Sequence, residues 1–308
     1  MKVVDLFAGC GGMSLGFEQA KHKVVAAFEY WDAAIKCYKA NFRHPIIKQD
    51  LSNFQEAAQK ISKFQPDMII GGPPCQDFSH AGKRSEGSNA DLTYAFAQII
   101  KLVAPRWFVM ENVDRTKNSR TYAQARAIFK EAGYGLTEIV LDASLCGVPQ
   151  KRKRFFCIGL LDAEDDFLKS ELESRLSSSP MTVRDYFGNK LGIKYYYRHP
   201  RNYNRRAVFS IDEPAPTIRG VNRPVPKGYK GHPKDAGPVT DQLRELTTHE
   251  RSMIQTFPPD FIWIGSKTNL EQMIGNAVPV KLAEFVGRAI KEYDEQLEKS
   301  FEGLTADG

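Results

Sequence analysis

The sequence predicts an α/β protein with a doubly wound parallel sheet and a second, smaller domain rich in loops. Over the first 160 residues, short apolar runs alternate with stretches of helical periodicity. That alternation then breaks, and residues 198–240 are rich in proline and glycine and carry much of the surplus basic charge. With 308 residues, 42% of them hydrophobic, the chain is long enough for one large domain or for a large and a small one.

Each predicted element follows from its local pattern. Short apolar runs have the length of buried strands at residues 3–7, 24–28, 68–70, 107–110 and 155–161. Stretches with helical periodicity lie between several of them, at residues 13–20, 33–40, 54–62, 94–103 and 122–132. Helical patterns return at residues 248–255 and from 280 to about 297. Residues 298–308 are expected to form a frayed tail.

The composition excludes several classes of protein. No apolar run approaches the ~18 residues of a membrane-spanning helix, and the chain starts directly with a strand-like segment rather than a secretory leader. The five cysteines are an odd number without a Cys-x-x-Cys pair, so neither a disulfide framework nor a structural zinc site is expected. These features favour a cytoplasmic protein without a metal site.

The charge is distributed unevenly along the chain. The net charge is +6, yet residues 183–234 contain twelve Lys and Arg against three Asp and Glu, a local charge of +9. The same stretch holds tyrosines at positions 186, 195, 196, 197, 203 and 229. Clustered cations interleaved with aromatic rings are typical of a nucleic-acid surface, where release of counterions drives binding. A solvated basic face, or an insert without fixed structure, explains the charge alone equally well.

A glycine-rich turn, Asp5-Leu-Phe-Ala-Gly9-Cys-Gly11-Gly12, separates the first predicted strand from the first predicted helix. Glycines there allow a tight turn and a close approach to a ligand at the carboxyl edge of the sheet. Their spacing differs from the dinucleotide pattern Gly-x-Gly-x-x-Gly, which argues against a nicotinamide enzyme. A turn with a purely structural role is the alternative.

Two acids and an aromatic ring suit a ligand at that edge. Glu29 ends the second predicted strand, where a carboxylate can accept hydrogen bonds from ribose hydroxyls. Asp50 falls where the third strand should end, and it could accept a hydrogen bond from an adenine amino group. Tyr30 offers a ring on which adenine could stack. Each acid taken singly could instead cap a helix, but with the glycine turn they favour a cofactor that carries adenosine.

A cysteine and a carboxylate follow two successive apolar runs. Cys75 comes after Gly-Gly-Pro-Pro, and the prolines restrict its backbone. A free thiol has a pKa of roughly 8.5, so a nucleophilic Cys75 needs a nearby helix start, Arg152 or Arg154 to favour the thiolate. Burial at the end of its apolar run should raise the pKa of Glu111, which suits a group that donates or shares a proton. An inert core cysteine and a surface acid are the alternatives for the two residues taken separately.

A basic segment, Gln150-Lys151-Arg152-Lys153-Arg154, precedes the last of the predicted strands. If the segment is extended, Gln150, Arg152 and Arg154 share one face and the two lysines share the other. Three planar donors on one face could hold a phosphate and the edge of a base. A basic loop without a role is the alternative.

Together these motifs resemble the cytosine-C5 methyltransferase family, in the family's own order, over residues 3–160 and 245–290. The glycine turn resembles its cofactor motif, and Glu29 and Asp50 match its ribose and adenine acids. Its nucleophile, acid and arginine motifs are matched by Pro74-Cys75-Gln76, Glu111-Asn112-Val113 and Gln150-x-Arg152-x-Arg154. The late motif that completes its cofactor pocket is matched by Gly275-Asn276-Ala277-Val278-Pro279.

The resemblance implies a Rossmann-like methyltransferase sheet with a smaller target recognition domain. Residues 1–170 and 268–308 would form the catalytic domain, which binds S-adenosyl-L-methionine, and residues 171–267 the recognition domain. The implied activity is methyl transfer to C5 of a cytosine flipped out of a short duplex DNA site. The implied cofactor contacts are Phe7, Ala8, Gly9, Cys10, Gly11, Gly12, Glu29, Tyr30, Asp50, Leu51, Pro74, Asn276 and Ala277.

The resemblance also implies roles in catalysis. Cys75 would attack C6, Glu111 would contact N3, and Arg152 would brace the flipped base, with Gln150 and Arg154 beside it. The DNA-binding candidates are Ser79, Lys83 and Arg84 in the loop after the cysteine, and Thr217 and Arg219 in and beside the segment Pro-Ala-Pro-Thr-Ile. Two departures from the family are the absence of Asp-x-Arg after that loop and the replacement of a stacking tryptophan by Tyr30.

Double-stranded DNA is therefore the expected partner, a separate restriction endonuclease for the same site is a candidate companion, and a monomer is the simplest expectation. One rival is a tRNA cytosine methyltransferase, but the Cys-Phe-Thr tripeptide typical of that branch is missing from the recognition region. A non-catalytic DNA-binding homologue is the other rival, and the intact cysteine, acid and arginine set argues against it.

Overall fold

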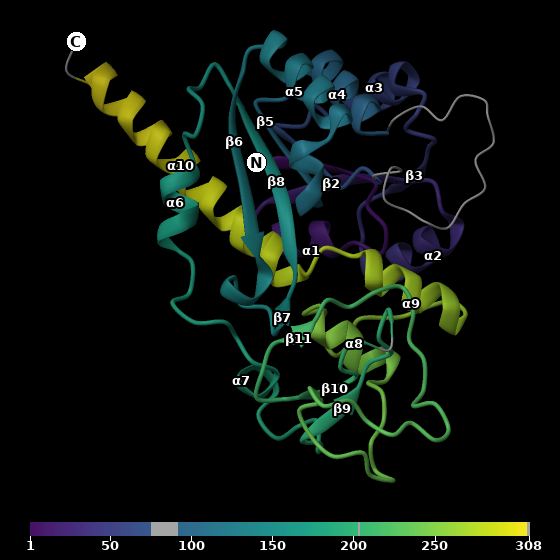
Figure 1. Cartoon of the computed structure of the whole chain (residues 1–308). Helices are drawn as coiled ribbons and strands as arrows, with labels where there is room; N and C mark the ends of the chain where they lie inside the picture. Colours follow the sequence, from purple (N-terminus) through teal and green to yellow (C-terminus); the bar gives the residue numbers. More distant parts are fainter. Residues whose placement is uncertain (75–91, 203, 307–308) are drawn as a thin grey trace.

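A computed structural model describes residues 1–74, 92–202 and 204–306, and it contains a seven-stranded central sheet (Figure 1). The strands follow one another across the sheet in the order β3-β2-β1-β4-β5-β8-β6. Their bounds are β1 Lys2–Leu6, β2 Lys23–Glu29, β3 Ile46–Lys48, β4 Met68–Gly71, β5 Trp107–Val113, β6 Tyr134–Asp142 and β8 Lys153–Leu161. The strand order reverses between β1 and β4, and open α/β sheets bind ligands at the carboxyl ends of strands at such a point.

One strand of the sheet runs against the others. β8 is antiparallel to both of its neighbours, β5 and β6, whereas β1, β2, β3, β4 and β5 pair in parallel. The prediction of a parallel sheet is therefore wrong for residues 155–161. Only the short segment 143–152 joins β6 to β8, and a parallel return would need a crossover of about a dozen or more residues.

Helices cover both faces of the sheet, as the alternating pattern predicted. Val3 and Val109 belong to the core cluster on one face, and their neighbours Val4 and Phe108 belong to the cluster on the other. The first face is covered by α1 (Gly12–Gln19), α6 (Lys169–Ser174) and α10 (Val280–Ala306). The second face is covered by α3 (Phe54–Ser62), α4 (Leu92–Val103) and α5 (Arg120–Glu131).

The end of the chain returns to the glycine-rich turn. A third core cluster joins Cys10 of that turn, α2 (Asp32–Asn41) and Met273 of α9 (Lys267–Asn276). α10 then packs closely on α1, because a Cβ added to Gly16 would lie 2.5 Å from the Cβ of Ala283. Residues some 270 positions apart thus meet at the carboxyl edge of β1.

A smaller, loop-rich part lies below the sheet in Figure 1 and has a core of its own, with Val183, Tyr196, Phe209, Ile218 and Ile254 among its buried residues. Its elements are α7 (Val183–Phe187), β9 (Tyr195–Tyr197), β10 (Val208–Ser210), β11 (Ala215–Pro216) and α8 (Thr248–Ile254). β11 pairs in parallel with β7 (Gln150–Lys151), which connects this part to the sheet. The domain boundaries at residues 170 and 267 stay a prediction.

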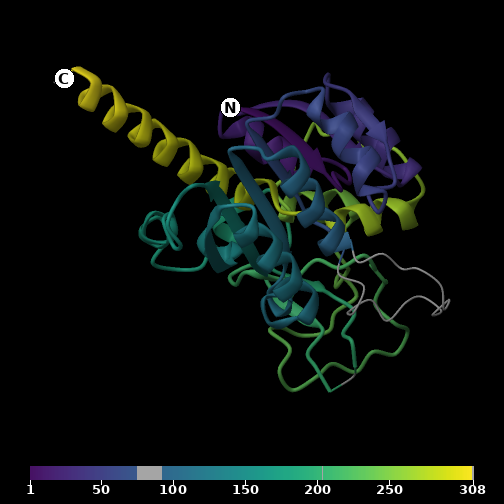
Figure 2. The ribbon, with the colours of Figure 1, turned by 90° about the horizontal axis from the view of Figure 1, so that it is seen from above.

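The structure confirms the strands and helices that the sequence predicted and adds others. β6 was missed because its sequence, Tyr-Gly-Leu-Thr-Glu-Ile-Val-Leu-Asp, interrupts apolar residues with polar ones, and the mixed sequence of α9 concealed a helix. The prediction of a frayed tail is wrong for residues 298–306, because α10 continues to Ala306 and projects beyond the sheet in Figure 2. Within the described parts of the chain, no helix combines the length and apolar character that a membrane span requires.

Candidate active site and nucleic-acid interface

The glycine-rich turn between β1 and α1 is built from left-handed backbone. Phe7, Gly9 and Gly11 have φ angles of 57°, 55° and 99°. Phe7 is the unusual member, since a left-handed bulky residue is strained and such strain concentrates at functional sites. A Cβ on Gly12 would lie only 2.3 Å from the carbonyl oxygen of Val278. Gly12 therefore allows the late motif to pack directly against the turn.

Glu29 fixes this turn from the neighbouring strand. Its Oε2 accepts a hydrogen bond from the backbone N–H of Gly9 at 2.8 Å. Its Oε1 accepts the N–H groups of Tyr30 and Trp31, each at 2.8 Å. A carboxylate has about four acceptor positions, so one remains for a ligand. Glu29 thus holds the backbone around it and can still contact a bound molecule.

A cavity of about 550 Å³ lies against the turn and brings distant motifs together. Of the residues predicted from the sequence, its wall contains Phe7, Ala8, Gly9, Cys10, Gly12, Glu29, Pro74, Glu111, Arg152, Arg154, Asn276 and Ala277. We call this space the main cavity. Most of the cofactor candidates and the candidate catalytic acid thus lie around one space, as expected from the ends of adjacent strands.

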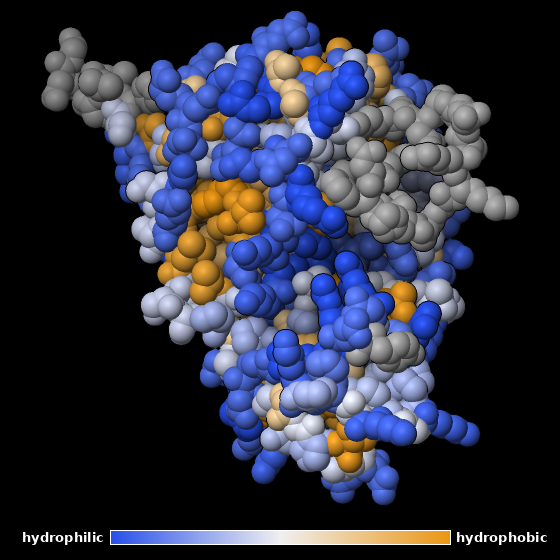
Figure 3. Space-filling model, in the orientation of Figure 1, coloured by the Kyte–Doolittle hydropathy of each residue, from blue (hydrophilic) through white to orange (hydrophobic). Residues whose placement is uncertain are grey.

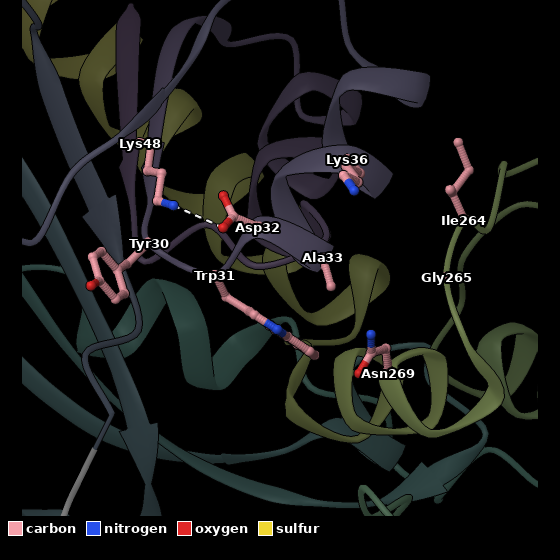
Figure 4. A pocket seen from close by; sticks show the side chains of 9 residues that line it. All are labelled: Tyr30, Trp31, Asp32, Ala33, Lys36, Lys48, Ile264, Gly265 and Asn269. Carbon is pink, nitrogen blue, oxygen red and sulfur yellow. Dashed lines mark hydrogen bonds and ion pairs between the residues drawn. The ribbon is translucent and has the colours of Figure 1, made fainter.

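Several predicted residues lie outside the wall of the main cavity. Tyr30 is 64% exposed and belongs to a neighbouring hollow of about 690 Å³, together with Lys48 and Asn269 (Figure 4). Trp31, which the sequence analysis missed, lines both spaces and is, with Phe7, an aromatic residue in the wall of the main cavity. Figure 4 also shows Lys48 bound to Asp32 across the hollow, at 2.8 Å.

Asp50, Leu51 and Gly11 also lie outside that wall. Asp50 is exposed, and its Oδ1 accepts the N–H of Ser52 at 2.9 Å, so it closes its own turn. Leu51 is buried in the core on the α3–α5 side. Gly11 packs against the ring of Phe42, where a Cβ would come within 2.3 Å of it. Their positions give these residues local structural roles.

Burial favours the neutral form of two side chains in the wall of the main cavity, Cys10 and Glu111. Burial raises the pKa of the Cys10 thiol, which keeps it neutral and unsuited to be a nucleophile. Burial also raises the pKa of Glu111, as predicted, although the guanidinium groups of Arg154 and Arg152 act against this. Arg154 Nε lies 2.9 Å from Glu111 Oε1. Glu111 is thus held in one orientation by Arg154 while burial favours its neutral form.

The proline segment before Cys75 is tied to the strand that carries Glu111. Asn112 Nδ2 donates a hydrogen bond to the carbonyl oxygen of Pro73 at 2.8 Å. A Cβ on Gly72 would lie 2.9 Å from Glu111 Oε2, so the two segments are in close contact. Pro74 lines the main cavity. The predicted Cys75, Ser79, Lys83 and Arg84 lie outside the described residues.

The predicted alternation along residues 150–154 is confirmed. Gln150 and Arg152 are buried, whereas Lys151 and Lys153 are exposed. Gln150 lies away from the main cavity: its Oε1 accepts the N–H of Ile218 at 2.9 Å, and its Nε2 donates to Gln255 at 2.7 Å. Gln150 therefore joins the sheet to the loop-rich part.

Arg152 also joins these parts, from the wall of the main cavity. It donates to the carbonyl oxygens of Ile218 and Gly275, both at 3.0 Å, and of Ala277 at 3.2 Å. Its Nε is buried and has no hydrogen-bond partner among the described residues. Burial, assisted by Arg154, lowers the pKa of Arg152. The side chain thus fixes the late motif against the loop-rich part.

A second, wider cleft of about 1110 Å³ adjoins the main cavity, with which it shares Val113, Arg152, Arg154, Gly275 and Asn276. We call it the basic cleft, because its wall includes Lys151, Lys153, Arg115, Arg198, Arg201, Arg205, Arg206, Arg219 and Lys234. Hydrophilic side chains gather around the middle of the face shown in Figure 3, between the sheet and the part below it.

The two DNA-binding candidates of this part both line the basic cleft. The hydroxyl of Thr217 donates to the carbonyl oxygen of Lys151 at 2.9 Å. Arg219 donates to the carbonyl oxygen of His199. Both residues therefore shape the wall of the cleft through their own hydrogen bonds.

The main cavity also contains Asp5, which the sequence analysis placed in the glycine-rich turn but not among the cofactor contacts, and Met273, which it missed. A carboxylate inside an otherwise apolar strand was the available signal for Asp5, since an acid there needs a reason to be buried. Met273 belongs to the helix that the sequence analysis did not predict. Among the described residues, no group of three or more His, Cys, Asp or Glu is arranged to hold a metal ion.

The fold and its two adjoining spaces define an α/β enzyme with its site at the carboxyl edge of the sheet. A family model described as C-5 cytosine-specific DNA methylase matches residues 1–292. The chain belongs to this family, and it is a DNA cytosine methyltransferase with a Rossmann-like sheet.

Two curated relatives agree with this assignment, and one solved structure has a similar fold. The chain is 58% identical to the Type II methyltransferase M.HindV of Haemophilus influenzae, over 96% of this chain and 98% of that protein. It is 55% identical to the Type II methyltransferase M.HgiDI of Herpetosiphon aurantiacus, over 95% of each. Its fold is similar to that of the S. pombe Dnmt2 methyltransferase, with a TM-score of 0.69 at 18% identity, over 96% of this chain and 99% of the other.

Proposed function

We propose that this enzyme transfers the methyl group of S-adenosyl-L-methionine to C5 of a cytosine flipped out of duplex DNA, through a transient bond from Cys75 to C6. The observation that carries this proposal is the shared wall of the main cavity. The glycine-rich turn and Glu29 lie around the same space as Pro74 and Glu111. A methyl donor and a base bound there would be neighbours.

The residues of the main cavity fit such a donor. Phe7, Met13 and Val278 offer apolar contact, and the carboxyl groups of Asp5 and Glu29 can face a cation and ribose hydroxyls. S-adenosylmethionine is a sulfonium cation that carries adenosine, and when bound it would supply an electrophilic methyl group. Asn276 and Ala277, from the late motif, complete the wall.

The chain's own groups would carry the remaining chemistry. Addition of the Cys75 thiolate to C6 makes C5 nucleophilic, provided that N3 receives a proton or a strong hydrogen bond. Glu111 suits that task, because burial raises its pKa and Arg154 orients it. After methylation, loss of the C5 proton to a base lets the thiolate leave and restores the ring.

The basic cleft is the proposed DNA site. Its cations can neutralise phosphates, and it joins the main cavity at Arg152 and Arg154. A cytosine in a stacked duplex cannot reach the cavity, so it must swing out, which costs a few kcal/mol. Duplex bound in the cleft would have the entrance of the main cavity beside it.

A covalent trapping experiment tests the proposal. A duplex with 5-fluorocytosine at the target site should form a stable adduct with the enzyme in the presence of S-adenosylmethionine, because fluorine cannot leave as a proton does. Cys75→Ser should bind the same duplex without forming an adduct or methylating it. Methylation of cytosine by Cys75→Ser would refute the proposed role of the cysteine.

The identity to Type II methyltransferases favours a modification enzyme with a short specific site, and a companion endonuclease for that site. Bisulfite sequencing of a plasmid from cells that express the protein would identify the site and the methylated cytosine. A parallel assay with labelled methyl donor on tRNA tests the rival substrate. Methylation of tRNA and not of duplex DNA would contradict the proposal.

A further inference from the structure

A buried polar chain leads from the main cavity toward the surface on the α2 side of the molecule. Asp5 lines the cavity, and its Oδ2 lies 2.6 Å from the hydroxyl of Ser14. That hydroxyl lies 2.6 Å from the hydroxyl of Tyr38, which is 2.7 Å from Nε2 of His44. Nδ1 of His44 faces Glu18 Oε1 at 3.4 Å, and Glu18 is partly exposed. None of these contacts is used in the methyl transfer described above.

The hydrogens of this chain can be arranged in only two consistent ways. Each hydroxyl donates one hydrogen, so neighbouring hydrogen bonds must point in the same direction. With Asp5 as a neutral acid, it donates to Ser14, Ser14 to Tyr38, and Tyr38 to Nε2 of His44. His44 is then neutral, and its Nδ1–H faces Glu18.

With Asp5 as a carboxylate, every bond reverses. Nε2–H of His44 donates to Tyr38, Tyr38 to Ser14, and Ser14 to Asp5. The carboxylate of Glu18, which faces Nδ1, favours a hydrogen on that nitrogen as well. His44 is then an imidazolium ion.

The two arrangements contain the same number of protons. The O–H bond of Asp5 breaks and the Nε2–H bond of His44 forms, while each hydroxyl passes one proton on and receives another. The exchange needs no water in the cavity and no further reactant.

We propose that Asp5, Ser14, Tyr38 and His44 form a proton-transfer chain through which the main cavity adjusts its charge to the methyl donor. In the empty cavity Asp5 is a neutral acid. When a cationic donor enters, Asp5 becomes a carboxylate and its proton moves to His44. After methyl transfer the sulfonium charge is gone, and the proton returns to Asp5, which weakens the hold on the product. This inference rests on the proposed donor.

Two features make the exchange easy. Burial raises the pKa of Asp5 to about 7, so this carboxyl group can give up its proton near neutral pH. The charged groups that face the chain are Glu29, from β2, and Glu18, from α1, and both are acids. Glu29 opposes the carboxylate of Asp5, while Glu18 favours the imidazolium.

Nuclear magnetic resonance of protein labelled at its histidine nitrogens tests the proposal. The chain has six histidines, and His44→Gln identifies the signals of His44. At pH 7, saturating S-adenosylmethionine should convert His44 from the neutral Nδ1–H form to imidazolium. S-adenosylhomocysteine, which lacks the sulfonium charge, should produce a smaller conversion. His22, buried and bound to the carbonyl oxygen of Gly287, is the internal reference and should not respond.

Two variants separate transfer along the chain from other effects of binding. Asp5→Asn and Tyr38→Phe should both abolish the response of His44. Tyr134→Phe is the matched control: it also removes a buried hydroxyl, one that donates to Pro105, and should leave the response intact. If the variants fail to fold, the spectra of the unmodified protein with donor and with product still show whether His44 responds to the sulfonium charge.

The possible outcomes are distinct. If calorimetry shows that the donor binds while His44 does not change, this inference is wrong and the proposed function stands. If His44 responds equally to donor and product, the chain does not sense the sulfonium charge, and the inference is again wrong. If S-adenosylmethionine does not bind at all, the proposed function fails and the inference fails with it.

Discussion

At the scale of single residues, Glu111 carries the clearest catalytic prediction. Glu111→Gln keeps the shape of the side chain but removes the proton that it would share with N3. We expect the rate of methyl transfer in single-turnover experiments to fall by about two to four orders of magnitude, while duplex binding stays within severalfold. An equal loss of binding and rate would instead indicate that Glu111 acts only by holding Arg154.

Asp5 carries a prediction about stability and pH. Burial raises its pKa from 3.8 to about 7, so the folded protein holds this proton more tightly than the unfolded chain. This proton contributes fully to the free energy of unfolding below about pH 4, and the contribution is lost as the pH rises through about 7. Asp5→Asn does not titrate and so avoids this loss of free energy, which is at most about 4 kcal/mol.

Thermal unfolding of the donor-free protein measures the effect. The melting temperature of Asp5→Asn relative to the unmodified protein should rise between pH 5 and pH 8. A difference that stays constant over this range would mean that Asp5 does not titrate there.

Residue by residue, the sequence predicted which charged groups lie together better than it predicted their contacts. Glu29, Glu111 and Arg152 line one cavity, as expected for charged groups at the ends of neighbouring strands, and their roles stay predictions. The sequence could not distinguish Tyr30 from Trp31, since the two are adjacent in the sequence and only the local backbone conformation decides which ring faces the cavity. It also could not show that Gln150 lies away from the main cavity, because its partners, Ile218 and Gln255, become its neighbours only in the folded chain.

At the scale of elements, buried and exposed side chains alternate along residues 150–153, from β7 to β8, and the two faces have different roles. Gln150 and Arg152 point inward and hold the structure together, while Lys151 and Lys153 line the basic cleft. Lys151→Ala and Lys153→Ala should each weaken duplex binding, and each should reduce the slope of log affinity against log salt by about 0.9.

The effect should not depend on DNA sequence, because phosphate contacts carry no sequence information. Lys63→Ala, an exposed lysine at the end of α3 and away from the cleft, is the matched control and should leave the slope unchanged. Fluorescence anisotropy over a range of salt concentrations measures the slope. Unchanged slopes for both lysine variants would place the DNA elsewhere.

The helix α9 shows how closely the late motif is packed. A Cβ on Gly275 would lie 2.2 Å from the backbone nitrogen of Gly220, so α9 touches the segment around Gly220 directly. Gly275→Ala should destabilise the protein by about 1–3 kcal/mol through overpacking. Thr268→Ala, at an exposed position of the same helix, should change stability by less than about 0.5 kcal/mol, as chemical denaturation can establish. No destabilisation by Gly275→Ala would mean that the segment around Gly220 can move away freely.

Elements followed from the sequence wherever the apolar period was regular. β1, β2 and α3 are of this kind, since their apolar residues are buried in the cores on the faces of the sheet. The sequence did not predict β6 and α9, because their polar residues have partners outside the element itself. Tyr122 and Arg126, for example, bind Glu138 of β6, and Arg251 binds Glu271 of α9. A local pattern contains no sign of such partners.

At the scale of the whole molecule, buried contacts join the sheet to the loop-rich part. Arg152 binds carbonyl oxygens at Ile218 and Gly275, and Gln150 links Ile218 to Gln255. Breaking these contacts would leave buried donors and acceptors without partners, which costs about 1–3 kcal/mol each. Neither part can therefore unfold without destabilising the other.

We accordingly expect calorimetric unfolding of the donor-free protein to show one transition, with equal calorimetric and van't Hoff enthalpies. Gln150→Ala should lower its midpoint and, if the coupling is localised there, separate it into two transitions. Lys63→Ala again serves as the control and should keep a single transition. Two transitions in the unmodified protein would show that the parts fold independently, and the contacts of Arg152 and Gln150 would then align the cavity and the basic cleft without stabilising either part.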